Sequence, residues 1–504
     1  MLTQFDWIGK QAIYQPHKTA ITEWGREREL TYGELNRLAE QTARWWIYEL
    51  GLKSGDRVAM LAENSLEMVV LFSAAQKTGI ILVPLNYRLA CPELREILQN
   101  CEPKLLLTDP ALRELGWSIL EKHPLPHSHL EELLDGVGGV SLESPLPEIE
   151  FDQDHPIFIL YTSGTTGIPK GVIYTHRMLL WNSLNTALRL NLTSDDRTLN
   201  FMPPFHTGGW NVLLTPFLHH GAWTCLMKQF DAGEVLQAMD QYRVTIAMGV
   251  PTMLKMMAEC PNFESTDMEA LRYMVVGGEP MPIPLIETWA DKGVPVRQGF
   301  GMTEAGPNLF SLHQQDAIRK KGSIGQPNFY LEVKILDDDH QPVPDGQSGE
   351  LCVRGAVVTP GYWENPTATA THIQDGWLHT GDMVIRDTEG YFFVVDRKKH
   401  MFISGGENVY PAEVERALRM HPAINEVVVV PIPHEKWGEC GCAVVVFERG
   451  KQLSLDDIKA FAKTLLAGYK IPKTLHVVAT LPKNATGKID RRKLLQTVLE
   501  TSHA

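Results

Sequence analysis

A loop rich in hydroxyl and glycine residues, set between an apolar strand and a lysine, most constrains the fold of this chain. Ile157–Tyr161 is continuously apolar and predicts a buried strand, and a helix is predicted from about His176. Between them stand Thr162, Ser163, Gly164, Thr165, Thr166 and Gly167, followed by Lys170. Glycines let backbone N–H groups converge on an anion, hydroxyls add donors, and the lysine adds charge. The loop therefore predicts a polyphosphate cradle rather than a plain surface turn.

The spacing within this loop and elsewhere excludes several common motifs. Lys170 is followed by Gly171, so the spacing of a Walker A loop is missing. Gly299-Phe-Gly301 is followed by Met-Thr-Glu, which does not complete the dinucleotide-binding G-x-G-x-x-G pattern. No G-x-S-x-G elbow occurs, which disfavours a serine hydrolase.

Alternating strand and helix patterns in the first part of the chain predict a layered α/β domain. Thr31–Leu52 is helix-like and begins with a capping-box pattern. Arg57–Leu61, Ile80–Val83 and Lys104–Thr108 read as short buried strands, and Ser65–Thr78 reads as a helix between the first two. Strand, helix, strand in this order favours a mostly parallel sheet.

The pattern changes after about Gly322. A small antiparallel unit is predicted from strands at Val333–Asp337, Gly349–Arg354 and Tyr391–Val395. A further α+β run is predicted from helices at Ala412–Met420, Leu455–Leu466 and Arg491–Leu499 and from strands at Glu426–Pro431, Cys442–Phe447 and Thr474–Ala479. The sequence thus predicts two domains, 1–396 and 397–504.

Composition narrows the class of protein. The 504 residues carry a formal charge of −14, which argues against a general nucleic-acid binder. Seven scattered cysteines do not form a disulfide framework, and Cys440 and Cys442 fit a buried strand better than a zinc site. No apolar run reaches the roughly 18–20 residues that span a membrane, and the N-terminus lacks a signal-peptide pattern. A cytoplasmic protein is expected.

Five motifs, in family order, resemble the adenylate-forming superfamily of acyl-CoA synthetases, peptide-synthetase adenylation domains and firefly-type luciferases. They are Tyr161–Gly171, Gly299–Glu304, Thr380–Asp382, Asp396–Lys399 with Ser404–Asn408, and Pro482–Ile489. The resemblance covers nearly the whole chain. It implies an α/β fold with a large N-terminal domain of layered α/β sheets, a small antiparallel β subdomain and a mobile α+β C-terminal domain.

The resemblance implies an enzyme that uses ATP and Mg²⁺ to activate a small carboxylic acid, with coenzyme A as the acceptor. Thr303 would contact the α-phosphate, Glu304 and Thr166 would hold Mg²⁺, and Phe300 would stack on adenine. Asp382 and Arg397 would bind the ribose. The nucleotide site would also include the loop residues 162–167, Lys170, Gly278, Glu279, Pro280, Gly299, Gly301 and Met302.

The C-terminal motifs imply a two-step reaction. Lys488 would bridge the carboxylate and the α-phosphate during adenylation. The C-terminal domain would then rotate about Lys399, which matches the pivot position of the family. Relatives carry Asp or Lys at this position. The segment Ser404, Gly405, Gly406 and Glu407 would then line the pantetheine tunnel.

Phe205–Trp210 resembles the aromatic–histidine motif of acyl- and aryl-CoA ligases, which places His206 at the substrate carboxylate. The expected acyl pocket consists of His206, Gly209, Trp210, Val250, Gly277 and Pro307. Trp210 would gate a fatty-acid tunnel or simply pack in the core. Because no charged residue stands out in this pocket, a medium- or long-chain fatty acid is favoured, with an aryl or o-succinylbenzoate-type acid as the rival.

Other functions are left open by the sequence. A catalytically silent nucleotide-binding protein would share the motifs, although retention of Lys170, Glu304, Asp382 and Lys488 speaks against it. The chain ends without a carrier domain, which favours CoA over a carrier protein, and without a peroxisomal Ser-Lys-Leu, which disfavours a luciferase. The acid itself and a homodimeric state are undecided.

Overall fold

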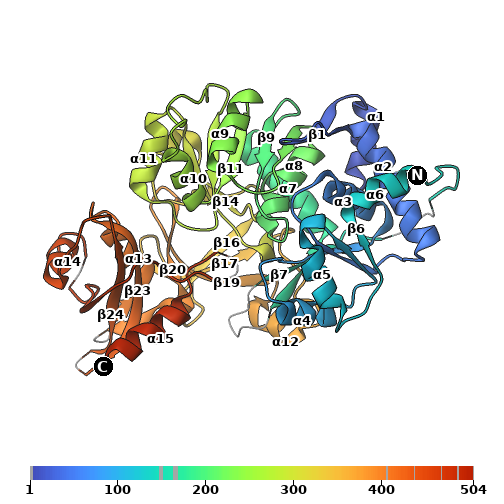
Figure 1. Cartoon of the computed structure of the whole chain (residues 1–504). Coiled ribbons are helices and arrows are strands. Elements are labelled where there is room, and N and C mark those ends of the chain that lie inside the picture. Colours follow the sequence, from blue (N-terminus) through green and yellow to red (C-terminus); the bar gives the residue numbers. More distant parts are fainter. Residues whose placement is uncertain are drawn as a thin grey trace. The chain divides into compact units, whose positions relative to one another are not determined.

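The computed structural model describes residues 4–146, 151–162, 169–404, 407–435, 437–466, 468–484 and 487–502 (Figure 1). The chain forms two compact units. Unit 1 comprises Met1–Met281, Leu285–Val333 and Val353–Leu378, and unit 2 comprises Pro282–Pro284, Lys334–Cys352 and His379–Ala504. The units interleave along the chain, and the division into 1–396 and 397–504 stays a prediction.

The first sheet of unit 1 confirms the predicted parallel α/β layer. Within the described residues it has the strand order β6-β5-β3-β4-β7-β8. Its strands are β3 (Arg57–Leu61), β4 (Ile81–Pro84), β5 (Leu105–Thr108), β6 (His127–His129), β7 (Pro156–Thr162) and β8 (Lys170–Thr175). All neighbours pair in parallel except β7 and β8, which are antiparallel. The loop between β7 and β8 is the predicted phosphate cradle.

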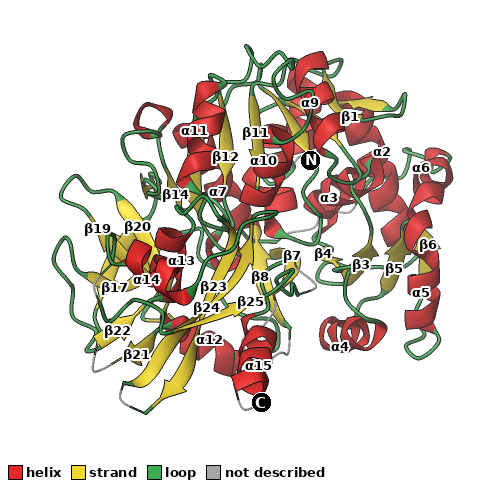
Figure 2. Cartoon of the chain, turned by 60° about the vertical axis from the view of Figure 1, so that its left-hand side comes forward, coloured by secondary structure: helices red, strands yellow, loops and turns green. Residues whose placement is uncertain are grey.

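Helices flank this sheet, as Figure 2 shows in red against the yellow strands. They are α2 (Tyr32–Arg44), α3 (Leu66–Thr78), α4 (Cys91–Cys101), α5 (Arg113–Leu120) and α6 (Leu130–Gly138). The predicted capping box at Thr31 is confirmed. The Thr31 side chain accepts a hydrogen bond from the backbone N–H of Glu34, and the Glu34 carboxylate accepts one from the backbone N–H of Thr31. Helix α2 continues as a π-helical turn, Trp45–Glu49, rather than as α-helix to Leu52. Every residue of helix α3 is buried, so the helix lies inside the core and has no polar face toward solvent.

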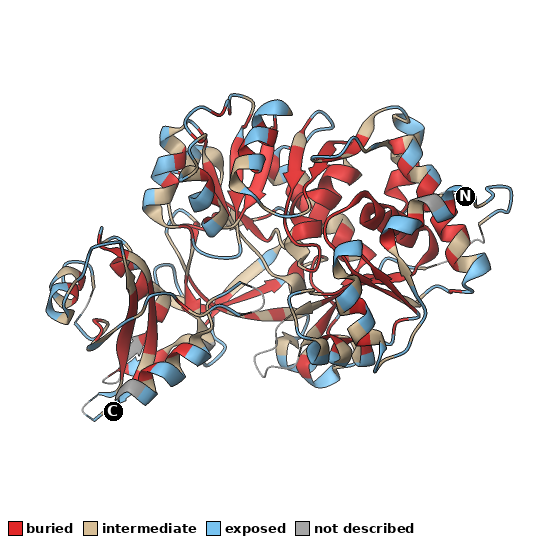
Figure 3. Ribbon diagram, in the orientation of Figure 1, coloured by how far each residue is buried: buried red, intermediate tan, exposed pale blue. Residues whose placement is uncertain are grey.

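Two further sheets belong to unit 1. One has the order β2-β1-β10-β9, with β1 (Thr19–Glu23), β2 (Glu29–Thr31), β9 (Arg197–Asn200) and β10 (Trp223–Leu226). The other has the order β11-β12-β13-β14-β15, with β11 (Ile246–Gly249), β12 (Tyr273–Val276), β13 (Val296–Phe300), β14 (Phe310–Ser311) and β15 (Gln326–Pro327). Strands β11, β12 and β13 run parallel. Strands β10, β11 and β12 are buried along their whole length, and buried residues are red in Figure 3.

Seven more α-helices occur in the described residues before β18. They are α1 (Trp7–Tyr14), α7 (His176–Leu190), α8 (Leu214–His219), α9 (Ala232–Gln241), α10 (Pro251–Ala258), α11 (Ile283–Asp291) and α12 (Pro366–His372). The predicted helix after His176 is confirmed as α7. Its N-cap Thr175 accepts a hydrogen bond from the backbone N–H of Met178.

The predicted small β unit and α+β region are also present. The first has the order β16-β17-β19-β18 with β20 beside β19; its strands are β16 (Glu332–Leu336), β17 (Ser348–Arg354), β18 (Ile373–Gln374), β19 (Trp377–Arg386) and β20 (Phe392–Arg397). The α+β region has the order β22-β21-β24-β23 with β25 beside β24. Its elements are β21 (Phe402–Ser404), β22 (Glu407–Val409), α13 (Pro411–Leu418), β23 (Ile424–His434), β24 (Gly438–Phe447), α14 (Leu455–Ala462), β25 (Thr474–Val477) and α15 (Arg491–Ser502).

Three expectations, on disulfides, metal sites and membrane spans, can be compared with the described part of the chain. All seven cysteines are free, and Cys440 and Cys442 are buried in β24, as predicted for a strand. Among the described residues, no group of histidine, cysteine and acidic side chains could hold a metal ion by itself. No helix in that part of the chain is long and apolar enough to cross a membrane.

Candidate active site

The predicted phosphate loop joins two adjacent antiparallel strands. Thr162 ends β7 and Lys170 begins β8, and the two residues are register partners. The Thr162 hydroxyl donates to the Lys170 carbonyl at 3.4 Å. Lys170 is therefore the first residue of β8, which pairs antiparallel with β7 at the edge of the sheet. Ser163, Gly164, Thr165, Thr166 and Gly167 lie outside the described residues.

A tyrosine that the sequence did not single out holds the predicted magnesium ligand. Glu304 belongs to a short 3₁₀ turn, Thr303–Ala305, and its carbonyl accepts from the N–H of Thr359 at 2.8 Å. The Tyr362 hydroxyl donates to Glu304 Oε1 at 3.0 Å. Burial, followed by the Glu304 carboxylate, raises the pKa of Tyr362, so the phenol stays protonated as a donor. This hydrogen bond orients a hard oxygen ligand of the kind that Mg²⁺ prefers.

The cationic group of the loop meets the same tyrosine. Lys170 Nζ lies 5.3 Å from the centroid of the Tyr362 ring and 3.5 Å from Nε2 of His372, the last residue of α12. The Tyr362 and His372 rings are 5.7 Å apart and close to edge-on. A backbone bond from Trp363 N–H to the Gly171 carbonyl, 2.7 Å, ties this segment to β8. Unit 1 thus gathers Lys170 and Glu304 around Tyr362, which is the charge pattern that a metal–polyphosphate needs.

The second predicted motif lies where β13 ends. Gly299 and Phe300 pair with Ser311 and Phe310 of β14, and the Phe300 and Phe310 rings meet edge-on at 5.9 Å. A Cβ added to Gly301 would stand 2.0 Å from the Pro307 carbonyl oxygen, so only glycine fits there. The chain around Gly301 and Met302 is therefore folded back onto Pro307, which presents Thr303 and Glu304 from a tight turn. Gly278 has φ +85°, which favours glycine, and the adjoining Glu279 and Pro280 are exposed.

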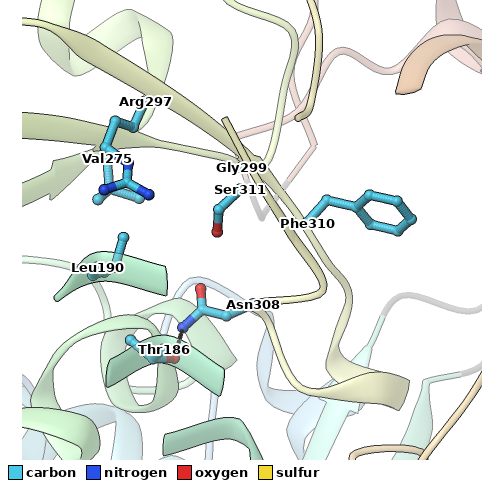
Figure 4. A pocket seen from close by; sticks show the side chains of 8 residues that line it. All are labelled: Thr186, Leu190, Val275, Arg297, Gly299, Asn308, Phe310 and Ser311. Carbon is cyan, nitrogen blue, oxygen red and sulfur yellow. Dashed lines mark hydrogen bonds between the residues drawn. The ribbon is translucent and has the colours of Figure 1, made fainter. Parts of the chain in front are cut away.

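A small cavity lies behind this motif (Figure 4). Its lining residues are Thr186, Leu190, Val275, Arg297, Gly299, Asn308, Phe310 and Ser311. Arg297 donates to the carbonyls of Leu312 and Arg189 at 2.9 and 2.7 Å, and Asn308 donates to the Thr186 hydroxyl at 2.5 Å. Burial lowers the pKa of Arg297 to about 10, which still leaves it charged at neutral pH. These contacts fasten β13 and its motif to α7.

The predicted aromatic–histidine motif leads into a π-helical turn, Gly208–Val212. His206 is half-buried, and its ring lies 4.6 Å from that of Phe205. Trp210 is fully buried, and its rings pack 5.0 Å from Phe158 and 5.7 Å from Phe72. Its indole N–H donates to the Pro204 carbonyl at 2.6 Å. This is the core packing that the sequence offered as the alternative, and a pocket role for Trp210 stays a prediction.

The other residues of the predicted acyl pocket are small or apolar. A Cβ on Gly209 would stand 2.4 Å from the Pro203 carbonyl oxygen, so the backbone is closely packed there. The methyl carbons of Met202 and Met248 each lie 3.8 Å from the position of a Cβ on Gly208. Val250 Cγ1 lies 3.7 Å from that position on Gly278, next to Gly277. Glycine backbones therefore lie beside apolar side chains at Gly208 and, separately, at Gly278.

In unit 2 the predicted ribose residues form an ion pair. Asp382 and Arg397 are register partners on β19 and β20, and Arg397 Nε lies 2.7 Å from Asp382 Oδ1. The Asp382 N–H donates to the Thr380 hydroxyl at 3.1 Å, and Arg397 also donates to the Thr380 carbonyl at 3.1 Å. Asp382 is buried, so this arrangement fixes its carboxylate against one cation.

The predicted hinge follows directly. Lys398 Nζ lies 3.0 Å from Asp338 and 3.3 Å from Glu350, and Glu350 also accepts from the N–H of Gly381 at 3.1 Å. Burial lowers the pKa of Lys398, but the two carboxylates together raise it above its usual value. Ser404 is buried at the end of β21. Gly405 and Gly406, with the side chains of Lys399 and Glu407, lie outside the described structure.

Lys488 is exposed on a tight turn of unit 2. Its backbone N–H donates to Asn484 Oδ1 at 3.1 Å, and its carbonyl accepts from the N–H of Asn484 at 2.7 Å. Gly487 has φ +82°, a conformation that favours glycine and turns the chain before Lys488. Two hydrogen bonds thus hold the backbone of Lys488, and the residue is exposed to solvent.

Comparison with protein families agrees with these motifs. The model of AMP-binding enzymes matches residues 9–363, and the model of the AMP-binding enzyme C-terminal domain matches residues 413–488. The chain belongs to the AMP-binding enzyme family. This confirms the resemblance to the adenylate-forming superfamily and its fold.

Several similar proteins are named as CoA ligases or synthases. A feruloyl-CoA synthase of Amycolatopsis sp is 39% identical, with 96% of each chain covered. An indoleacetate–CoA ligase of Aromatoleum aromaticum is 37% identical, with 98% of each covered, and a long-chain-fatty-acid–CoA ligase of Mycobacterium tuberculosis is 36% identical, with 99% of this chain and 98% of the relative covered. The chain is accordingly an acid–thiol ligase.

Among solved structures, o-succinylbenzoate CoA synthetase from Bacillus subtilis, bound to its acyl-adenylate, superposes with a TM-score of 0.85. It is 34% identical, and 98% of each chain is covered.

Proposed function

We propose that this ligase activates an aryl or arylalkyl monocarboxylic acid as its acyl-adenylate and transfers the acyl group to coenzyme A. ATP and Mg²⁺ serve the first step, and CoA is the co-substrate of the second. The observation that carries the adenylation chemistry is the convergence of Lys170 and Glu304 on Tyr362.

In the first step, an oxygen of the substrate carboxylate attacks the α-phosphorus of ATP. A bond forms between that oxygen and phosphorus, and the bond to the pyrophosphate oxygen breaks. Lys170 would hold the departing phosphates, and Thr303 would donate to the α-phosphate. Glu304 and Thr166 would bind Mg²⁺, which neutralises phosphate charge when it is bound. Lys488 would bridge the carboxylate and the α-phosphate, so its ammonium offsets charge on both reactants.

In the second step, the CoA thiol attacks the acyl carbonyl carbon. A C–S bond forms, the C–O bond to AMP breaks, and the thiol proton is lost to solvent or base. Asp382 and Arg397 would keep the AMP ribose in place during both steps. Rotation about Lys399 would remove Lys488 and bring the segment 404–407 to the pantetheine arm, as the resemblance implies.

Two features support an aryl acid over the fatty acid that the sequence favoured. Trp210 is packed against Phe72 and Phe158 with its N–H bonded, which fills the core behind the His206 motif. Met202 and Met248 meet Gly208, and methionine makes favourable contacts with aromatic rings. The feruloyl and indoleacetate ligases among the relatives agree with this assignment.

A medium- or long-chain fatty acid is the second candidate, because a long-chain-fatty-acid ligase is 36% identical over nearly the whole chain. The two classes are separated by pyrophosphate release with ATP, Mg²⁺ and CoA on ferulate, indoleacetate, benzoate, o-succinylbenzoate, octanoate and palmitate. The highest kcat/KM is expected on an aryl or arylalkyl acid. A maximum on palmitate would replace the aryl class with the fatty-acid class. ATP binding without release on any acid would favour the silent nucleotide-binding alternative.

A further inference from the structure

His372 stands beside the phosphate-loop lysine and has no role in the motifs described above. It ends α12, and its Nε2 lies 3.5 Å from Lys170 Nζ. Its ring also lies 5.7 Å from the Tyr362 ring, so His372 contacts both the lysine and the tyrosine that flanks it. Helix α12 is capped at its N-terminus, because its N-cap Asn365 accepts from the N–H of Ala368 at 2.9 Å and Thr369 donates to the Asn365 carbonyl at 2.9 Å.

We propose that His372 is a positioning residue for Lys170, which holds the ammonium group where it meets the β- and γ-phosphates of ATP and the departing pyrophosphate. The inference rests on the proposed role of Lys170 in nucleotide binding. His372 itself does not contact the reacting atoms in this role.

The chemistry of the contact assigns the imidazole tautomer. An ammonium group only donates, so Nε2 must accept and the proton of the neutral ring resides on Nδ1. The Tyr362 ring attracts the same ammonium from another side through its π face. A lysine side chain has four rotatable bonds and loses conformational entropy when it binds phosphate. The contacts with His372 and Tyr362 already restrict the Lys170 side chain before ATP binds. The entropy that it loses on binding ATP is therefore smaller.

The same contacts predict which substitutions preserve the role. Glutamine at position 372 places an amide oxygen near the position of Nε2 and can accept from Lys170. Leucine fills a similar volume but accepts nothing. Thr371, the neighbouring exposed residue of α12, donates to the Thr367 carbonyl at 2.8 Å within its own helix, so Thr371→Ala is the matched control.

The test compares His372→Leu, His372→Gln and Thr371→Ala in the full chain. Calorimetry gives the Kd of ATP and of pyrophosphate, and steady-state rates give KM for ATP and for the acid. Loss of one charge-assisted hydrogen bond to a half-exposed lysine should weaken ATP and pyrophosphate binding about tenfold in His372→Leu, or about 1.4 kcal/mol. His372→Gln should recover most of this loss, and Thr371→Ala should bind like the parent.

The result that supports the inference is a selective one. KM for ATP rises, KM for the acid is unchanged, and thioester formation from a supplied acyl-adenylate keeps its rate, since that step involves no polyphosphate. Unchanged Kd values for ATP and pyrophosphate in His372→Leu would overturn the inference. So would equal losses in the leucine and glutamine variants. Failure of the proposed function is a separate result, because the parent chain would then release no pyrophosphate with any acid.

Discussion

The hydrogen bond from Tyr362 to Glu304 offers a sharp prediction about the first half-reaction. Tyr362→Phe removes one hydroxyl and keeps the ring, which packs with Val172 and Ala368. The lost bond is 3.0 Å long and ends on a carboxylate. Hydrogen bonds to charged groups contribute about 1.5–3 kcal/mol. Because Glu304 is half-buried and reached by water, the lower end applies, which is roughly a tenfold change.

The loss should appear in the step that uses the metal–nucleotide. Tyr362→Phe is expected to lower kcat/KM for ATP in pyrophosphate release by about tenfold. More Mg²⁺ should be needed to reach half-maximal rate, because the Glu304 carboxylate is less well oriented. Thioester formation from a supplied acyl-adenylate should stay within about twofold of the parent, or about 0.4 kcal/mol, because that step involves no polyphosphate.

The matched control is Tyr242→Phe, whose ring packs against Trp24 and Trp223 away from the phosphate loop. It should leave both half-reactions and the Mg²⁺ requirement unchanged. The reasoning is refuted if Tyr362→Phe keeps the parent kcat/KM for ATP. It is also refuted if both half-reactions fall together, since that pattern indicates general damage rather than a misplaced metal ligand.

The remaining predictions concern the other parts of the site and the core. Lys488→Ala should abolish most adenylation and spare thioester formation from a supplied acyl-adenylate; equal losses would contradict the assigned role. Asp382→Asn removes the 2.7 Å ion pair with Arg397 and should raise the Kd of AMP and ATP in parallel, measured by calorimetry. Trp210→Ala should reduce the free energy of unfolding by about 3–5 kcal/mol in urea denaturation, as for other buried aromatics, and change the acid preference more than ATP affinity. Burial lowers the pKa of His176 to about 3, so the unfolded chain binds more protons between that pH and its ordinary pKa of 6.5. Stability should therefore fall as the pH drops through this window, and the fall should be smaller in His176→Phe.

Local patterns carried much of the fold prediction. The capping box at Thr31, the strand at Arg57–Leu61 and the helix that follows Ser65 all depend on neighbouring residues, and the structure confirms them. Strand β8 was not predicted, because it begins with the non-apolar Lys170 and Gly171 and its pairing with β7 decides its conformation.

The motifs singled out candidate residues more readily than the residues that contact them. Glu304 and Asp382 were predicted because short motifs surround them, and their roles stay predictions. Tyr362 and His372 were missed, since their partners Glu304 and Lys170 are 58 and 202 residues away in sequence. The pairing of β7 with β8 and the segment after β17, which ends in α12, bring these side chains together. The Pro-Gly turn before Tyr362 was the one local signal available.

Transfer of an oxygen isotope tests the central claim most directly. The preferred acid, labelled with ¹⁸O in its carboxylate, is converted to its CoA thioester with ATP and Mg²⁺, and AMP and pyrophosphate are examined by mass spectrometry. An acyl-adenylate leaves one carboxylate oxygen on phosphorus when the thiol breaks the C–O bond, so AMP should carry one ¹⁸O and pyrophosphate none. Unlabelled AMP, or label in orthophosphate together with ADP, would contradict the adenylate mechanism.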